Sequence, residues 1–73
     1  MKDMQGGKSQ AALSSREREI LGWLKLGKTS WEISQILDIT ERTVNFHINN
    51  IIRKLDASNR LQAVYEAINR DVV

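Results

Sequence analysis

One stretch of this sequence, TERTVNFHINNIIRKL at residues 40–55, carries the side chains best suited to chemistry. If the stretch is a helix, its apolar residues share one face, and these are Val44, Ile48, Ile51 and Leu55. The opposite face has no acidic residue and consists of Arg42, Asn45, Phe46, Asn49, Asn50 and Arg53. Amide and guanidinium groups read the edges of bases and bind phosphate. The pattern therefore predicts a helix that packs with one face and contacts nucleic acid with the other.

Four residues of this polar face are candidates for base contacts: Asn45, Asn49, Phe46 and Arg42. Asn45 and Asn49 are one helical turn apart, and an asparagine amide can pair with both N6 and N7 of adenine. Arg42 suits either a guanine or a phosphate. Phe46 suits a thymine methyl group, although packing against a neighbouring helix is the alternative. Asn50 lies at the edge of the face and is expected to be solvated.

A second group of residues is a candidate for phosphate contacts, which give affinity but carry no sequence information. Arg53 and Lys54 lie where such a helix would leave the groove. The remaining candidates are Thr43, Thr40, Lys28, Thr29, Ser30 and Trp31. Thr40 is equally well explained as a helix cap, and Trp31 as an ordinary surface side chain.

Two helices are expected before this stretch, because two capping boxes precede it. Ser14 and Glu17 begin a helix that runs to about Leu26 and stops at Gly27. Thr29 and Glu32 begin a shorter helix, which should bury Ile33, Ile36 and Leu37. Asp38 and Ile39 then form a tight connection to Thr40, with Ile39 filling the angle. Two helices joined in this way are typical of a helix-turn-helix.

A fourth helix is expected after a break at residues 56–59, with Ser58 as its cap and its end near Arg70. Leu61, Val64, Tyr65 and Ile68 should form its buried stripe. The fold class is all-α: a four-helix, tetrahelical helix-turn-helix domain over residues 13–70. Residues 1–12 are interpreted as a flexible linker or cloning tail, and residues 71–73 as a frayed C-terminus.

The composition excludes several classes of protein. The chain has 73 residues and no cysteine, so one small domain without disulfides is expected. Its single histidine, His47, makes a zinc site implausible, and we expect neither metal nor cofactor. No carboxylate pair, nucleophile–base set or glycine-rich loop indicates an enzyme. With no apolar span or signal sequence, the expected location is the cytoplasm, without membrane contact.

The distribution of charge favours a polyanion as partner. The net charge is only +2, yet residues 42–60 hold four basic residues and one acidic residue. Residues 14–41, in contrast, hold four basic and five acidic residues. A local basic stripe is typical of a nucleic-acid surface, although a chance fluctuation of surface charge would look similar.

Many spaced positions together resemble the LuxR-type (GerE-like) DNA-binding domain. They are Leu13 to Leu21, Gly27, Glu32-Ile33, Leu37, Ile39-Thr40, Thr43-Val44, His47, Ile51, Lys54-Leu55, Arg60 and Ala63-Val64. The resemblance implies a third helix, residues 41–55, in the major groove and a fourth helix that pairs with its copy in a dimer. Many members carry basic residues where this chain has Asn45 and Asn49. The Thr43 to His47 segment is similar to the branch of acyl-homoserine-lactone receptors.

These observations favour sequence-specific binding of double-stranded DNA by the output domain of a bacterial transcription regulator. The expected operator is an inverted repeat bound by a homodimer. An upstream sensor or receiver domain and a contact with RNA polymerase are left open. The alternative is a helical protein-interaction module, or a promoter-recognition domain like those of sigma factors.

Overall fold

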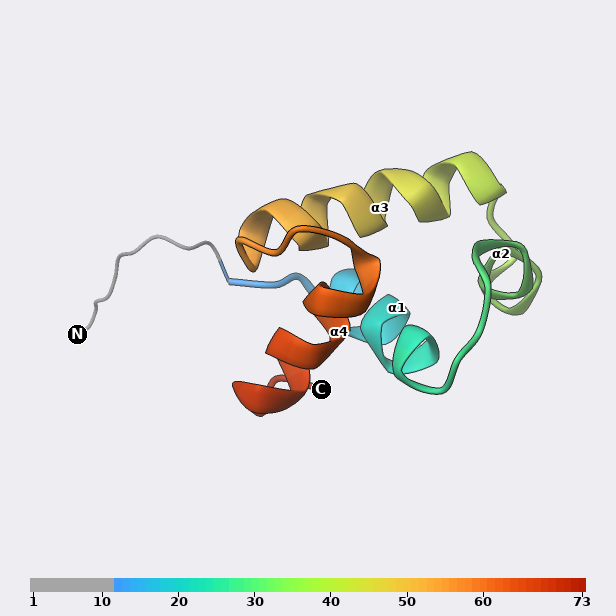
Figure 1. Cartoon of the computed structure of the whole chain (residues 1–73). Helices are drawn as coiled ribbons and strands as arrows, with labels where there is room; N and C mark the ends of the chain where they lie inside the picture. The colour runs from blue at the N-terminus through green and yellow to red at the C-terminus, as the bar shows by residue number, and fades with distance from the viewer. Residues whose placement is uncertain (1–11) are drawn as a thin grey trace.

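The computed structural model describes residues 12–73, which form four helices (Figure 1). They are α1 (Ser15–Lys25), α2 (Ser30–Leu37), α3 (Glu41–Lys54) and α4 (Arg60–Asn69). No strand occurs within these 62 described residues, so the prediction of a four-helix, all-α domain is confirmed. The predicted tail falls outside the described part of the chain, apart from Ala12.

The first three helices begin at the predicted residues. Ser14 and Glu17 exchange hydrogen bonds at the start of α1, with the Glu17 amide 3.1 Å from the Ser14 hydroxyl. Thr29 and Glu32 do the same at α2, and the hydrogen bond from the Thr29 backbone amide lowers the pKa of the Glu32 carboxyl. Thr40 caps α3 by accepting the Thr43 amide. Each cap satisfies amides that the helix itself leaves unpaired.

The turn between α2 and α3 forms without glycine. Asp38 ends α2 in the left-handed conformation, with φ 57° and ψ 45°. Aspartate tolerates this region better than most side chains because its short polar group makes local hydrogen bonds. Ile39 is half-buried and packs against the core, as expected of the residue that fills the angle. The turn therefore sets the direction in which α3 leaves α2.

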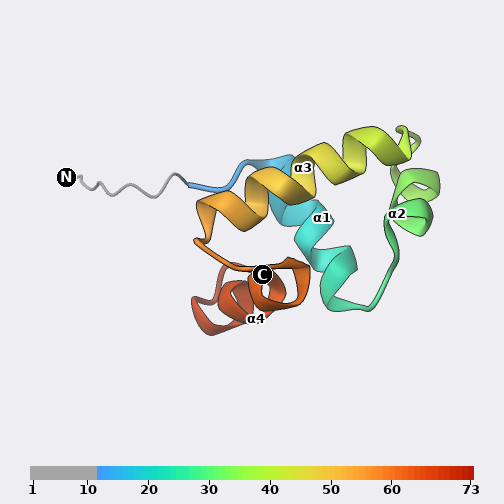
Figure 2. The same cartoon turned by 45° about the horizontal axis from the view of Figure 1, so that its top comes forward.

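Helix α3 runs along one side of the molecule, with α1 and α4 on the other side and α2 at its N-terminal end (Figures 1 and 2). Its predicted apolar face is buried: Val44, Ile48, Ile51 and Leu55 are all 5% exposed or less. They meet Ile20 and Leu21 of α1 and Ile33 of α2 in one core. The opposite side of α3 is covered by no other described helix.

The predicted buried stripe of α4 is wrong in three of its four positions. Leu61, Tyr65 and Ile68 are 80%, 61% and 49% exposed, whereas Ala63 and Ala67 are buried. The two alanines have small side chains, which let α4 approach the core closely. Size therefore decided which apolar face packs, and hydrophobicity alone did not.

Smaller corrections concern the ends of helices. Asn59, and not Ser58, caps α4 by accepting the Gln62 amide at 2.9 Å. In α2 the expected core residue Ile36 is 44% exposed, while Ser34 is buried. Beyond α4, the backbone amides of Asp71 and Val72 bond to carbonyls of its last turn, while the fraying of residues 71–73 stays a prediction. These bonds follow from a left-handed Asp71, a conformation that a helical pattern does not indicate.

Candidate nucleic-acid interface

The outward face of α3 presents five of the predicted contact residues to solvent. The exposed residues are Arg42, Asn45, Phe46, Asn49 and Arg53. They point outward because Val44, Ile48 and Ile51, which lie three and four positions apart, are anchored in the core. This face therefore offers two cations, two amides and one aromatic ring on a single rigid helix.

Phe46 is 62% exposed, which is unusual for a large aromatic side chain. Its ring makes an edge-to-face contact with the ring of His47, with centroids 5.7 Å apart and planes at 67°. The alternative prediction, packing against a neighbouring helix, does not describe this exposed position. Phe46 thus has one flank supported by His47 and most of its surface open to a partner.

Asn45 differs from Asn49, because its carbonyl oxygen is already engaged. The Ser30 hydroxyl, from the first turn of α2, donates to Asn45 Oδ1 at 2.7 Å. Arg60, the first residue of α4, donates from Nη2 to the Ser30 hydroxyl at 2.9 Å and to Asn45 Oδ1 at 3.5 Å. We call this cluster the Ser30–Asn45–Arg60 network. It joins three helices.

Sequence reasoning missed the role of Arg60 and expected Ser30 at a phosphate. Ser30 is only 6% exposed, and its hydroxyl lies in this network. The sequence signal for this contact is a small hydroxyl residue directly after an N-cap. That signal does not indicate which helices lie opposite the Ser30 hydroxyl. The pairing depends on how the helices cross.

Lys54 is also engaged within the fold. Its ammonium lies 2.9 and 3.2 Å from the two carboxylate oxygens of Glu17, which is 4% exposed, and 3.4 Å from the Ala12 carbonyl. Burial alone would raise the pKa of the Glu17 carboxyl. The Lys54 hydrogen bonds and charge, together with the Ser14 amide and hydroxyl, lower that pKa below its ordinary value. Glu17 therefore completes the predicted capping box and also pairs with Lys54.

The other predicted phosphate contacts lie at the starts of α3 and α2, apart from Arg53 in the last turn of α3. Thr40 is a cap, and its hydroxyl donates to the Thr43 hydroxyl at 2.9 Å, so the Thr43 proton can point elsewhere. Lys28, Thr29 and Trp31 surround the start of α2, with Trp31 58% exposed. Arg53 Nη2 donates to the Asn50 side chain, which pairs two polar residues of the same face.

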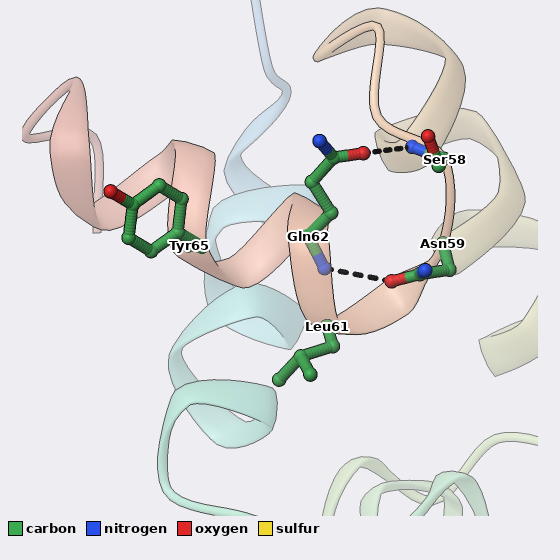
Figure 3. Close-up of a pocket in the computed structure, with 5 residues that line it drawn as sticks. All are labelled: Ser58, Asn59, Leu61, Gln62 and Tyr65. Carbon is green, nitrogen blue, oxygen red and sulfur yellow. Dashed lines mark hydrogen bonds between the residues drawn. The ribbon is translucent and has the colours of Figure 1, made fainter.

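One shallow pocket lies at the start of α4 and is lined by Ser58, Asn59, Leu61, Gln62 and Tyr65 (Figure 3). Two of its polar side chains take part in capping. The Gln62 side-chain oxygen accepts the Ser58 backbone amide, and Asn59 Oδ1 accepts the Gln62 backbone amide. Within residues 12–73, no three His, Cys, Asp or Glu side chains could together hold a metal ion. None of the described helices could span a membrane.

Comparisons with known proteins agree with this geometry. Residues 11–67 match the family model described as "Bacterial regulatory proteins, luxR family". The chain is 62% identical over 60 residues to the transcriptional activator protein SolR of Ralstonia nicotianae, which covers 82% of this chain and 25% of that protein. It is 56% identical over 61 residues to RpaR of Rhodopseudomonas palustris, an HTH-type quorum sensing-dependent transcriptional regulator, over 84% and 25% of the two chains.

A solved structure of the transcription factor GerE resembles the fold closely. The TM-score is 0.79 at 40% identity, and the match covers 89% of this chain and 94% of that one. The chain spans about a quarter of the length of the two curated relatives. Both the sequence matches and the structural match thus coincide with the four-helix domain described above.

Proposed function

The chain belongs to the luxR family of bacterial regulatory proteins, as a helix-turn-helix DNA-binding domain, and on that premise we propose that it binds a specific double-stranded DNA sequence through α3. In this proposal the domain is the DNA-binding output part of a bacterial transcription regulator. The N-terminal half of α3 enters the major groove, which is about 12 Å wide and accepts one helix.

The observation that carries the proposal is the uncovered, acid-free face of α3. Its exposed Arg42, Phe46, Asn49 and Arg53 all project from a helix whose other face is fixed in the core. A protein-binding helix usually exposes an apolar stripe, whereas this face is polar apart from Phe46. Donor-rich side chains on a rigid helix are suited to reading the acceptors on base edges in the major groove.

The proposal divides the residues by role. Asn49 is exposed and reads a base, while Arg42 contacts a guanine or a phosphate and Phe46 contacts a thymine methyl group. Arg53, Thr43, Lys28, Thr29 and Trp31 lie further out and are assigned to the sugar-phosphate backbone. We assign Lys54 and Thr40 to the fold instead, because one is paired with Glu17 and the other caps α3.

Two substitutions on α3 should separate base reading from phosphate binding. Asn49→Ala should relax the preference for one base pair, with a loss of about 1–3 kcal/mol of discrimination. Arg53→Ala should weaken binding to all sequences alike and reduce the slope of log affinity against log salt by about one. Titrations of a selected palindromic site and of scrambled DNA at several salt concentrations measure both effects. Equal affinity of the unchanged protein for the two DNAs would disprove specific binding.

The exposed stripe on α4 supports a homodimer on an inverted-repeat operator. Leu61, Tyr65 and Ile68 lie at i, i+4 and i+7 and leave an apolar face without a partner among the described residues. A two-fold dimer through this face would present two copies of α3 to two half-sites.

Replacing Leu61 by serine should weaken this dimer without unfolding the domain, because Leu61 is 80% exposed. Sedimentation on a palindromic DNA is expected to show two copies of the unchanged domain and, at the same concentration, mostly one copy of the variant. Identical stoichiometry for both proteins would place the dimer contact elsewhere.

The activity of the whole protein is proposed on the same basis. The named relatives are about four times longer than the matched segment, which is consistent with a sensor or receiver domain before this one. RpaR is described as a quorum sensing-dependent regulator, which supports a sensor of a quorum-sensing signal in the whole protein. A cytoplasmic location and a contact with RNA polymerase are part of this proposal.

A further inference from the structure

We propose that Ser30 and Arg60 position Asn45 as a donor-only group, so that α3 selects guanine over adenine at the base pair facing Asn45. The inference rests on the proposed function, because it concerns which base the same DNA-binding face prefers. It also replaces the expectation, drawn from the sequence, that Asn45 pairs with adenine. Ser30 and Arg60 are positioning residues here, since they act through the Asn45 amide.

The chemistry of Arg60 fixes the direction of every hydrogen bond in the network. A guanidinium group only donates, so the Ser30 oxygen, 2.9 Å away, must accept from it. The Ser30 proton is then free for Asn45, and the Asn45 atom at 2.7 Å must be an acceptor, which is Oδ1. The second, longer contact from Arg60 to the same atom requires an oxygen as well. The Asn45 amide nitrogen is therefore the group left for a ligand.

The buried position of Ser30 makes this orientation persist. Ser30 is 6% exposed, so its hydroxyl has little water to bond with if Asn45 turns away. Leaving a buried hydroxyl proton unpaired costs about 1–3 kcal/mol. The Arg60 charge also polarises the Ser30 hydroxyl, which strengthens the bond that the hydroxyl donates. Contact with DNA would have to offset both effects to turn the amide over.

A donor-only asparagine changes the base preference. Adenine presents N6 as a donor and N7 as an acceptor, so a paired contact needs both the oxygen and the nitrogen of an amide. Guanine presents two acceptors, N7 and O6. With Oδ1 engaged, Asn45 Nδ2 can satisfy guanine, whereas the adenine N6 group would meet no acceptor. The nearby Arg60 charge adds to the attraction for an acceptor-rich edge.

The test uses selection of bound sites from random DNA by the full 73-residue chain and by two matched variants. Ser30→Ala removes the hydroxyl that holds Asn45 Oδ1. Ser34→Ala removes another buried hydroxyl on the same helix, with Ser34 3% exposed and Ser30 6%. Among the described residues, the Ser34 hydroxyl bonds to the Trp31 carbonyl and the Gln35 side chain, away from Asn45. Both variants should lower the unfolding temperature slightly. Only Ser30→Ala should change the base preference, shifting one position towards adenine by roughly fivefold.

Two variants of Arg60 separate positioning from a direct phosphate contact. Arg60→Lys keeps the positive charge but loses the planar Nη2 group that donates to both Ser30 and Asn45. The slope of log affinity against log salt should therefore stay the same, while the base preference should shift at the same position as in Ser30→Ala. Asn45→Ala should remove the preference at that position and leave the others unchanged. A uniform loss of affinity in Arg60→Gln, with a salt slope smaller by about one and no change of base preference, would overturn the proposal.

The outcomes also distinguish this inference from the proposed function. If Ser30→Ala and Ser34→Ala select the same sites as the unchanged chain, the positioning role is disproved while specific DNA binding stands. If the unchanged chain enriches no sequence at all, specific binding itself fails. Selection of adenine by the unchanged chain, at the base pair that faces Asn45, would also overturn the inference.

Discussion

Replacing Ile51 by alanine is expected to leave the domain largely unfolded at room temperature. Ile51 lies on the inner face of α3 and is 0% exposed. Removing most of a buried isoleucine side chain costs about 2–5 kcal/mol, because the cavity is only partly refilled. A domain of this size rarely has more than about 3–5 kcal/mol of stability to lose. The loss is therefore comparable to the whole stability of the fold.

Circular dichroism during urea unfolding measures this effect, and Leu61→Ala provides the matched control. Leu61 is as large and as apolar but is 80% exposed, so its replacement should change the free energy of unfolding by less than about 0.5 kcal/mol. The sequence pattern placed both residues in the core, and the structure separates them. Similar losses for the two variants would contradict the described packing of α3 and α4.

The second large effect is expected for Glu17→Gln, which removes the charge that pairs with Lys54. Glutamine can still accept the Ser14 amide, so the capping box survives and only the ion pair is lost. The Glu17 side chain is 5% exposed and that of Lys54 is 28% exposed. Losing one partner of a buried pair is costly, but access of water to Lys54 reduces the cost. We expect a loss of about 1–3 kcal/mol at neutral pH.

The same ion pair predicts a dependence of stability on pH. Because the pKa of Glu17 is lowered in the folded state, its stabilising contribution is complete above its ordinary value of 4.5. The contribution is lost as pH falls through the folded-state pKa, since the unfolded chain then binds the proton more readily. Glu17→Gln should therefore unfold less steeply with acid than the unchanged protein.

Urea unfolding at pH values from about 7 to 3 tests this expectation, with Glu19→Gln as control. Glu19 lies on the same helix and pairs with Arg16 at 3.4 Å, but its side chain is 50% exposed. Its replacement should leave both stability and acid sensitivity nearly unchanged. A Glu17→Gln protein that follows the unchanged protein at every pH would show that the pair with Lys54 contributes nothing.

The sequence by itself determined the helices, because their signals are local. Ser14 with Glu17, Thr29 with Glu32, and Thr40 each bond within three residues along the chain, so the starts of α1, α2 and α3 could be predicted. The inner and outer faces of α3 could be predicted for the same reason, since helical spacing separates them over fourteen residues. The exposed contact candidates Arg42, Phe46, Asn49 and Arg53 follow from that spacing.

The tertiary structure alone decided which side chains meet between helices. On α4 two apolar faces compete, and the face with the small Ala63 and Ala67 packs against the core, while Leu61 and Tyr65 stay exposed. Small side chains allow a close approach of the helix to the core. Lys54 meets Glu17 across 37 residues, and Asn45 meets Ser30 and Arg60 across 15 each. Contacts of this kind depend on the angles and distances between helices, which no local spacing encodes. For this reason the sequence could identify the surface of α3 that we propose for DNA binding, while only the packed fold shows that Asn45 Oδ1 is engaged by Ser30 and Arg60.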